Sequence, residues 1–218
     1  MSFHQTGLIV AALVFGATAA NADVIQFTAT TATTDTPFTS NLVLSQFDTS
    51  LGTLNSVTLT FSATDTVASS VHNISTTSTD SVSGASASIP LSVTGPGGLA
   101  FNTTISAGPF EGTVSPGETV TLGTSSVDYN PAPLVISAAD FVSFEGPGSN
   151  SFTAVFDGGA VSASGTGVSN QDYFGGGGMA SGTLTVAYDY TPTEVPEPVS
   201  MALLGAGLAG LGLVRRRA

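Results

Sequence analysis

The sequence has 218 residues, a net charge of −12, no cysteine and no tryptophan. It also has no lysine, and its only arginines are Arg215, Arg216 and Arg217. These figures exclude disulfides, thiolate metal sites and a nucleic-acid binder, which needs a basic surface facing the phosphates. Because the carboxylates of residues 23–194 meet no lysine or arginine within that stretch, salt bridges cannot stabilise its fold. Apolar burial and backbone hydrogen bonds must do so.

The N-terminal residues resemble an export signal. Residues 8–15 are an unbroken apolar run, which Ala20-Asn21-Ala22 follows with small residues at alternate positions. A short apolar core before such an A-x-A pattern is typical of a secretory signal peptide, although this leader has no lysine or arginine. We expect residues 1–22 to be a signal helix, signal peptidase to cleave after Ala22, and the mature chain to begin at Asp23.

Short strands with period-two alternation follow. The clearest is the run Leu54–Phe61, in which apolar Val57, Leu59 and Phe61 alternate with polar residues. Two alternating runs separated by Thr94-Gly95-Pro96-Gly97-Gly98 predict a hairpin. In chain order the predicted strands are 24–28, 42–47, 54–61, 67–74, 87–93, 99–105, 119–122, 152–156, 160–164 and 184–190.

Three other segments are expected to lie outside these strands. The threonine-rich stretch 28–36 and the tether 191–194 should be extended and solvated, and the glycine run 175–178 should be a flexible loop. Residues 137–144 are the one helical candidate, of about two turns, with a capping-like Ser137-x-x-Asp140. Many short strands without covering helices predict one all-β domain over residues 23–194, an antiparallel β-sandwich of Ig-like or jelly-roll style.

The start and end of this domain resemble a known family. The segment Gln46–Leu54 with Val57-Thr58-Leu59, and the closing strand Leu184–Tyr190, are similar to the choice-of-anchor E domain. Members of that family carry different surface-attachment tails. The resemblance therefore implies a β architecture and a surface location, and it implies no catalytic motif.

The C-terminal tail has three parts. Val195-Pro196-Glu197-Pro198 precedes the apolar stretch 199–214, and the three arginines follow. As a helix, this stretch would span about 24 Å, less than the roughly 30 Å hydrocarbon core of a bilayer. We therefore expect a short, transient transmembrane helix whose arginines stay on the cytoplasmic side as a stop signal. A permanent single-span anchor is the alternative.

Residues 195–218 resemble the PEP-CTERM sorting signal of Gram-negative, exopolysaccharide-producing bacteria. The resemblance implies that an exosortase recognises the tail and cleaves near Pro196-Glu197-Pro198. The protein would then pass from an inner-membrane intermediate to the cell surface, the outer envelope or the extracellular matrix.

Candidate chemistry in the domain is sparse. A catalytic triad needs a histidine, and His72 lies out of phase with apolar Val71, as a solvent-facing strand residue would. Calcium prefers oxygen ligands, and several aspartates lie near predicted strand ends, although no D-x-D-x-D-G array groups them: Asp48, Asp65, Asp80, Asp128, Asp157 and Asp172. No catalytic, cofactor-binding or metal-binding residue is therefore assigned.

The sequence thus predicts a non-enzymatic protein of the cell surface or matrix, with adhesion or exopolysaccharide association in a biofilm as its role. A secreted carbohydrate-active enzyme and a calcium-dependent glycan-binding module are the alternatives. A threonine-array surface of the ice-binding kind is a further one, and only residues 28–33 approach its regular T-x-T spacing.

Overall fold

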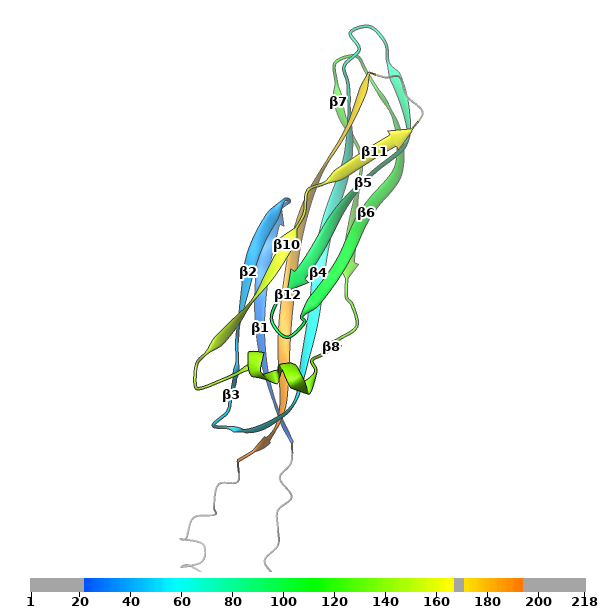
Figure 1. The fold of residues 1–218 in the computed structure, drawn as a ribbon. Helices are drawn as coiled ribbons and strands as arrows, with labels where there is room; N and C mark the ends of the chain where they lie inside the picture. Colours follow the sequence, from blue (N-terminus) through cyan, green and yellow to red (C-terminus); the bar gives the residue numbers. More distant parts are fainter. Residues whose placement is uncertain (1–21, 167–170, 194–218) are drawn as a thin grey trace, which may run out of the picture. The chain divides into compact units, whose positions relative to one another are not determined.

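A computed structural model describes residues 22–166 and 171–193, and most of these residues lie in β-strands (Figure 1). The elements in chain order are β1 (Asp23–Asp35), β2 (Phe38–Ser45), β3 (Phe47–Asp48), β4 (Gly52–Asn73), β5 (Asp80–Thr94), β6 (Ala100–Val114), β7 (Thr119–Tyr129), β8 (Leu134–Val135), the 3-10 helix η1 (Ala138–Ser143), β9 (Glu145–Gly146), β10 (Ser151–Gly158), β11 (Ser162–Thr166) and β12 (Asp172–Pro192).

Two antiparallel sheets make up most of the fold. Sheet A has the order β1-β12-β4-β7, and β8 also pairs with β4. In sheet B, β6 pairs with one side of β5, while β11 and β10 pair in turn along its other side, and β2 continues from β10. The short strands β3 and β9 pair in parallel. The prediction of an all-β, antiparallel fold is confirmed.

The core lies between the inner faces of the two sheets. Phe61 of β4 lies at the centre of this core. The centroid of the Phe61 ring is 5.3 Å from that of Phe156 on β10 and 5.8 Å from that of Phe101 on β6. Tyr188 of β12 is fully buried, and its hydroxyl donates a 2.9 Å hydrogen bond to the carbonyl of Ser45. Burial of this phenol raises its pKa. Two sheets packed on a main apolar core, with a second, smaller cluster of Val71, Val82, Ala85 and Val114, agree with a β-sandwich.

The runs 54–61 and 67–74, predicted as two strands, are one strand. β4 is 22 residues long, about 70 Å at the usual rise per residue. Residues 62–66 are polar except for Ala63 and include Asp65, so the segment shows no apolar alternation that would indicate a strand. They pair with β12 on one side and β7 on the other, which supplies the backbone hydrogen bonds that keep the strand continuous.

The threonine-rich stretch 28–36 is also a strand for most of its length. Residues 28–35 continue β1, which pairs with β12, and a register shift separates Thr31 from Thr34. The expectation of a solvated segment is therefore wrong for the backbone, although most of these side chains are exposed. Thr191 and Pro192, expected in a tether, complete β12 by pairing with Thr53 and Gly52.

The run Gly175–Gly178, expected to be a flexible loop, lies within β12. It pairs with residues 67–70 of β4. A Cβ on Gly176 would stand 2.7 Å from both the Ala68 carbonyl oxygen and the Val161 Cγ1 atom. Gly178 likewise has the buried Ile89 side chain where a Cβ would stand. The missing side chains therefore let neighbouring strands and the opposite sheet approach β12 closely.

The helical candidate 137–144 is the six-residue 3-10 helix η1. Ser137 is its N-cap residue but makes no side-chain capping hydrogen bond. Within residues 22–166 and 171–193, none of the helical structure has the length and apolar character that a membrane crossing requires. The predicted signal helix, apart from Ala22, and the predicted transmembrane helix lie outside the described residues.

Candidate functional site

The aspartates considered as calcium ligands are spread over the fold. Asp48 is the last residue of β3 and accepts a 2.9 Å hydrogen bond from the Ser50 amide, which lowers its pKa. Asp128, at the end of β7, accepts a 2.7 Å hydrogen bond from the Thr64 hydroxyl. Asp157 lies on the outer face of sheet B. These three carboxylates therefore belong to three separate parts of the surface.

One pair of these aspartates does interact. Asp172 begins β12, and burial together with the negative charge of Asp80 raises its pKa. Two carboxylates alone make a poor calcium site, since calcium takes six to eight oxygen ligands. Within the part of the chain that the structure describes, no group of three or more His, Asp or Glu side chains could hold a metal ion.

Asp65 is not a loop residue at a strand end, as the sequence suggested. It lies in the middle of β4, points into the core and is only 1% exposed. Neither of its carboxylate oxygens has a hydrogen-bond partner among the described residues, and the same holds for the buried Ser69 hydroxyl. Burial raises the pKa of Asp65 to about 6. This carboxyl is a cost to the fold rather than a surface ligand.

His72 occupies the solvent side of β4, as its phase predicted. Val71 beside it is fully buried, while the imidazole is half-buried. Its Nδ1 atom lies 2.9 Å from the Thr119 hydroxyl and 3.2 Å from the Glu118 carbonyl oxygen. The ring thus joins β4 to the start of β7, which is a structural contact.

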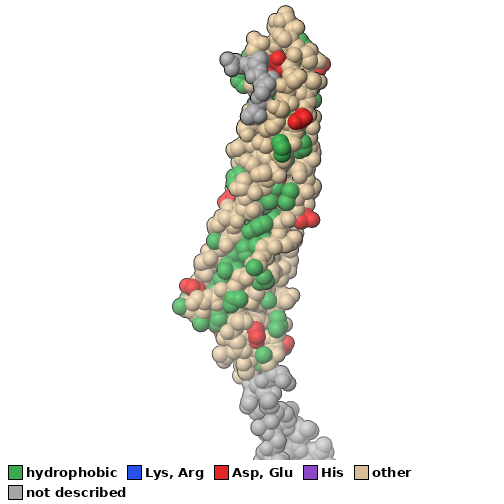
Figure 2. Space-filling model, turned by 90° about the vertical axis from the view of Figure 1, so that its right-hand side faces the viewer, with side chains coloured by type: hydrophobic (Ala, Val, Ile, Leu, Met, Phe, Trp, Pro, Cys, Tyr) green, Lys and Arg blue, Asp and Glu red, His purple; other side chains and the backbone are tan. Residues whose placement is uncertain are grey.

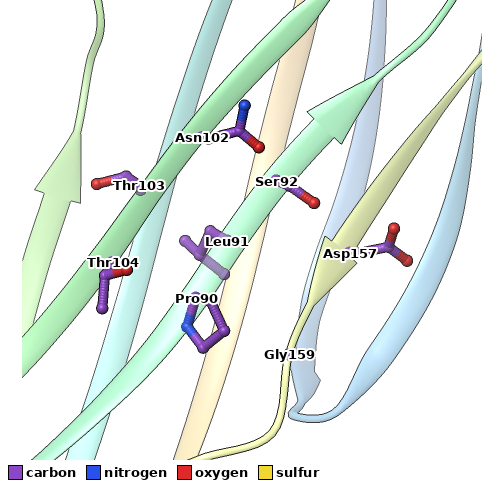
Figure 3. A pocket seen from close by; sticks show the side chains of 8 residues that line it. All are labelled: Pro90, Leu91, Ser92, Asn102, Thr103, Thr104, Asp157 and Gly159. Atoms are coloured by element: carbon purple, nitrogen blue, oxygen red, sulfur yellow. The ribbon is translucent and has the colours of Figure 1, made fainter.

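A shallow depression of about 460 Å³ lies on the outer side of sheet B, across β5, β6 and the end of β10 (Figure 3). We call it the sheet B depression. Its polar side chains come from neighbouring strands, and one carboxylate is its only charged group. The lining residues are Pro90, Leu91, Ser92, Asn102, Thr103, Thr104, Asp157 and Gly159.

Strand register places the polar groups in one row. Ser92 is paired with Asp157 on β10 and with Asn102 on β6, and Asp157 is paired in turn with Thr39 on β2. Figure 3 shows Asn102, Ser92 and Asp157 following one another across the three strands. Side chains opposite one another in paired strands share a face, so this row of four stands on the outer surface.

A second depression adjoins the first. It measures about 380 Å³, shares Asp157 and Gly159 with the sheet B depression, and is lined further by Pro37, Phe38, Thr39 and Gly158. Asp157 therefore stands between two hollows on the same sheet. Phe38 is half-buried there, with its ring 5.1 Å from that of Phe156.

The outer side of sheet A has its own depression of about 310 Å³, which we call the sheet A depression. It also contains one Asp and one Asn, but part of its polar surface is already engaged. Thr64 donates to Asp128, and Ser181 donates to the Thr64 carbonyl oxygen at 3.4 Å. Its lining residues are Ser62, Ala63, Thr64, Asp128, Asn130, Ser181, Gly182 and Thr183.

Sequence reasoning named Asp157 but missed Ser92 and Asn102. Both lie within the hairpin that it predicted over residues 87–105, at positions out of phase with the apolar residues. That phase placed them on the outer face. It could not indicate which other strand would bring a carboxylate beside them, because β10 lies far along the chain from the hairpin.

The residues assigned to processing and sorting mostly lie outside the described part of the chain. This applies to Ala20, to Val195-Pro196-Glu197-Pro198 and to the three arginines. Ala22 is exposed, and β1 begins at Asp23. Cleavage between these two residues remains a prediction.

Hydrophobic side chains also reach the surface on the side of the molecule where β6 and β7 approach each other. Figure 2 shows a band of them there, with acidic side chains standing singly. The Tyr129 hydroxyl of β7 donates a 3.3 Å hydrogen bond to the Asn102 carbonyl oxygen of β6, and Phe110 packs against Gly123. Side chains thus close this edge between the two sheets.

Solved structures to which the chain is similar include distant likenesses from viruses. An infectious bursal disease virus structure, of the Gx strain, is 12% identical and has a TM-score of 0.22; the match covers 85% of this chain and 42% of that one. The subviral particle of that virus's VP2 is 11% identical, with a TM-score of 0.27 and coverages of 85% and 43%. Desmodium yellow mottle tymovirus is 11% identical, with a TM-score of 0.22 and coverages of 86% and 98%.

TM-scores of this size do not establish a shared fold, and this chain spans less than half of the first bursal virus chain. No curated protein matches the sequence.

The informative match concerns the C-terminal tail. Residues 194–217 match the model of the PEP-CTERM protein-sorting motif. This confirms that the tail is a PEP-CTERM sorting motif, and the match includes the Pro-Glu-Pro sequence, the apolar stretch and the arginines. The chain therefore carries the signal of an exported protein that an exosortase sorts in the envelope of a Gram-negative bacterium.

Proposed function

We propose that this protein is a non-enzymatic component of the cell surface or extracellular matrix, which associates with exopolysaccharide in a biofilm. A choice-of-anchor E type domain delivered by its tail would present two broad sheet faces outside the cell. The observation that carries the proposal is the sorting motif at residues 194–217, because it supports export of the domain to the cell envelope or surface.

The domain's side chains support a binding role over a catalytic one. The hydrogen-bond partners of His72 are Thr119 and the Glu118 carbonyl, and none of the six aspartates considered as ligands is among them. Asp128 and Asp48 are held by hydrogen bonds in separate places. By contrast, the outer face of sheet B presents hydroxyl, amide and carboxylate groups in one row, which is the chemistry that recognises hydroxyl-rich chains.

Sorting is tested by replacing Pro196, Glu197 and Pro198 together with alanine in the native host. Because the exosortase would no longer recognise the tail, we expect an unprocessed precursor in the inner-membrane fraction, whereas wild-type protein reaches the surface or medium without its arginine cluster. Mass spectrometry of both termini is the measurement. Normal processing of the triple variant would refute sorting through this motif.

The matrix role is tested separately, by comparing biofilm mass and polysaccharide retention in a deletion strain and its complemented parent. The purified protein is also incubated with a glycan panel, with and without EDTA. Unchanged biofilm would contradict the proposal. Glycan hydrolysis would instead establish the carbohydrate-active enzyme, and loss of glycan binding in EDTA would establish the calcium-dependent module.

A further inference from the structure

We propose that the sheet B depression is a subsite for a segment of an uncharged polysaccharide chain. This inference rests on the proposed function and narrows it to one face of the domain and one class of glycan. It follows from the hydrogen-bonding groups, extent, apolar borders and charge of the depression.

The polar groups of the depression are available to a ligand. The side chains of Ser92, Asn102, Thr104 and Asp157 make no hydrogen bond with any other described residue. The Tyr129 hydroxyl donates to the Asn102 backbone carbonyl and does not occupy the Asn102 side chain. In the sheet A depression, by contrast, Thr64 and Asp128 are bonded to each other. Hydroxyl, amide and carboxylate groups together can both donate to and accept from sugar hydroxyls.

The row is long enough for more than one sugar unit. Thr39, Asp157, Ser92 and Asn102 occupy four adjacent strands, so the row extends about 14 Å at the usual strand spacing. The adjoining depression around Phe38 and Thr39 continues the hollow beyond Asp157. Both hollows are shallow and lie on a sheet surface. A chain can therefore lie across the strands, without an end having to enter a closed pocket.

Apolar surface borders the polar row. Pro90 is exposed beside Ser92, and Pro37 and the half-buried Phe38 line the adjoining depression. The C–H faces of sugar rings pack on such surfaces, while their hydroxyls need hydrogen-bonding partners. The alternation of apolar and polar groups in these two hollows matches that amphipathic character.

Charge selects a neutral glycan over an acidic one. Asp157 is the only charged residue that lines either hollow. No lysine or arginine precedes Arg215, so no such side chain of the domain can pair with uronate, phosphate or sulfate groups. An acidic chain would meet the Asp157 carboxylate and a protein of net charge −12, which repel it.

The test uses the exported protein recovered from its host and three kinds of immobilised polysaccharide. The neutral probes are dextran, galactomannan and mixed-linkage β-glucan; alginate is the anionic probe and chitosan the cationic one. We expect binding to at least one neutral probe and none to alginate. Asn102→Ala and Asp157→Ala should each weaken that binding about tenfold or more, because each removes a hydrogen-bonding side chain from the contact.

Asn130→Ala and Asp128→Ala are the matched controls, since they remove the same residue types from the sheet A depression. We expect them to bind the neutral probe as wild type does. Thermal unfolding of all four variants verifies that each is folded. If Asn102→Ala and Asp157→Ala bind a neutral probe as tightly as wild type, the assigned subsite is wrong while polysaccharide association stands.

Other outcomes separate the inference from the function on which it rests. Retention by chitosan alone, abolished by salt, would overturn the inference in favour of general charge attraction. Retention in native matrix without binding to any neutral probe would overturn the inference and leave the matrix role intact. Failure to associate even with native matrix would overturn the proposed function itself.

Discussion

Asp65→Asn should change how the stability of the domain depends on pH. Asp65 is 1% exposed, its oxygens have no partner among the described residues, and its pKa rises from 3.8 to about 6 on folding. A shift of this size corresponds to about 3 kcal/mol, since one pKa unit is worth about 1.4 kcal/mol. Between the two pKa values the folded state binds the proton more tightly than the unfolded state does. The unfolding free energy therefore falls as the pH rises through this range.

The wild-type domain should therefore lose about 3 kcal/mol of unfolding free energy through this group as the pH rises from below 4 to above 6. Asparagine has nearly the same shape and does not titrate. The difference in unfolding free energy, Asp65→Asn minus wild type, should increase by the same amount between pH 3 and pH 8. The buried asparagine amide shifts this difference equally at every pH, so it does not affect the change.

Urea unfolding followed by far-ultraviolet circular dichroism or tyrosine fluorescence measures this difference. Contributions from other carboxylates, including the raised pKa of Asp172 and the lowered pKa of Asp48, cancel in the subtraction. Ser69→Ala is the control, because it alters a buried, unpartnered hydroxyl that does not titrate in this range. A difference in unfolding free energy that stays constant to within about 0.5 kcal/mol between pH 3 and pH 8 would refute the reasoning. A carboxyl whose pKa changes this much on folding must make stability depend on pH.

Two further predictions concern packing. Gly176→Ala should destabilise the domain by about 1–3 kcal/mol, because its Cβ would meet the Ala68 carbonyl and Val161, whereas Gly177→Ala, with no atom within 4 Å, should stay within about 0.5 kcal/mol in urea unfolding. Equal effects at the two glycines would contradict the close approach at Gly176. Leu59→Asp should abolish cooperative thermal unfolding, since it buries an unpaired carboxylate at a cost of several kcal/mol, while Thr60→Asp on the solvent side should unfold cooperatively. An intact transition in Leu59→Asp would mean that the inner face of β4 is wrongly assigned.

Local patterns were sufficient for the sorting motif, the all-β class and the phase of most strands. A motif such as Pro196-Glu197-Pro198 with its apolar stretch and arginines is read in linear order, so no folding is needed to find it. Likewise, the alternation around Leu59 and along the hairpin 87–105 directly reports which side chains are buried. The same alternation placed His72 on the solvent side of its strand.

The sequence by itself thus determined the sorting signal of this protein, its class of fold and the burial of its apolar strand residues. Only the tertiary structure decided that the glycine run and the threonine-rich stretch are strands, because their pairing comes from distant neighbours and not from their own side chains. It also decided that Asp65 is buried and that Asp157, Ser92 and Asn102 form one row. Strand order and register between segments far apart in the chain set these positions, and periodicity within a segment carries no information about them.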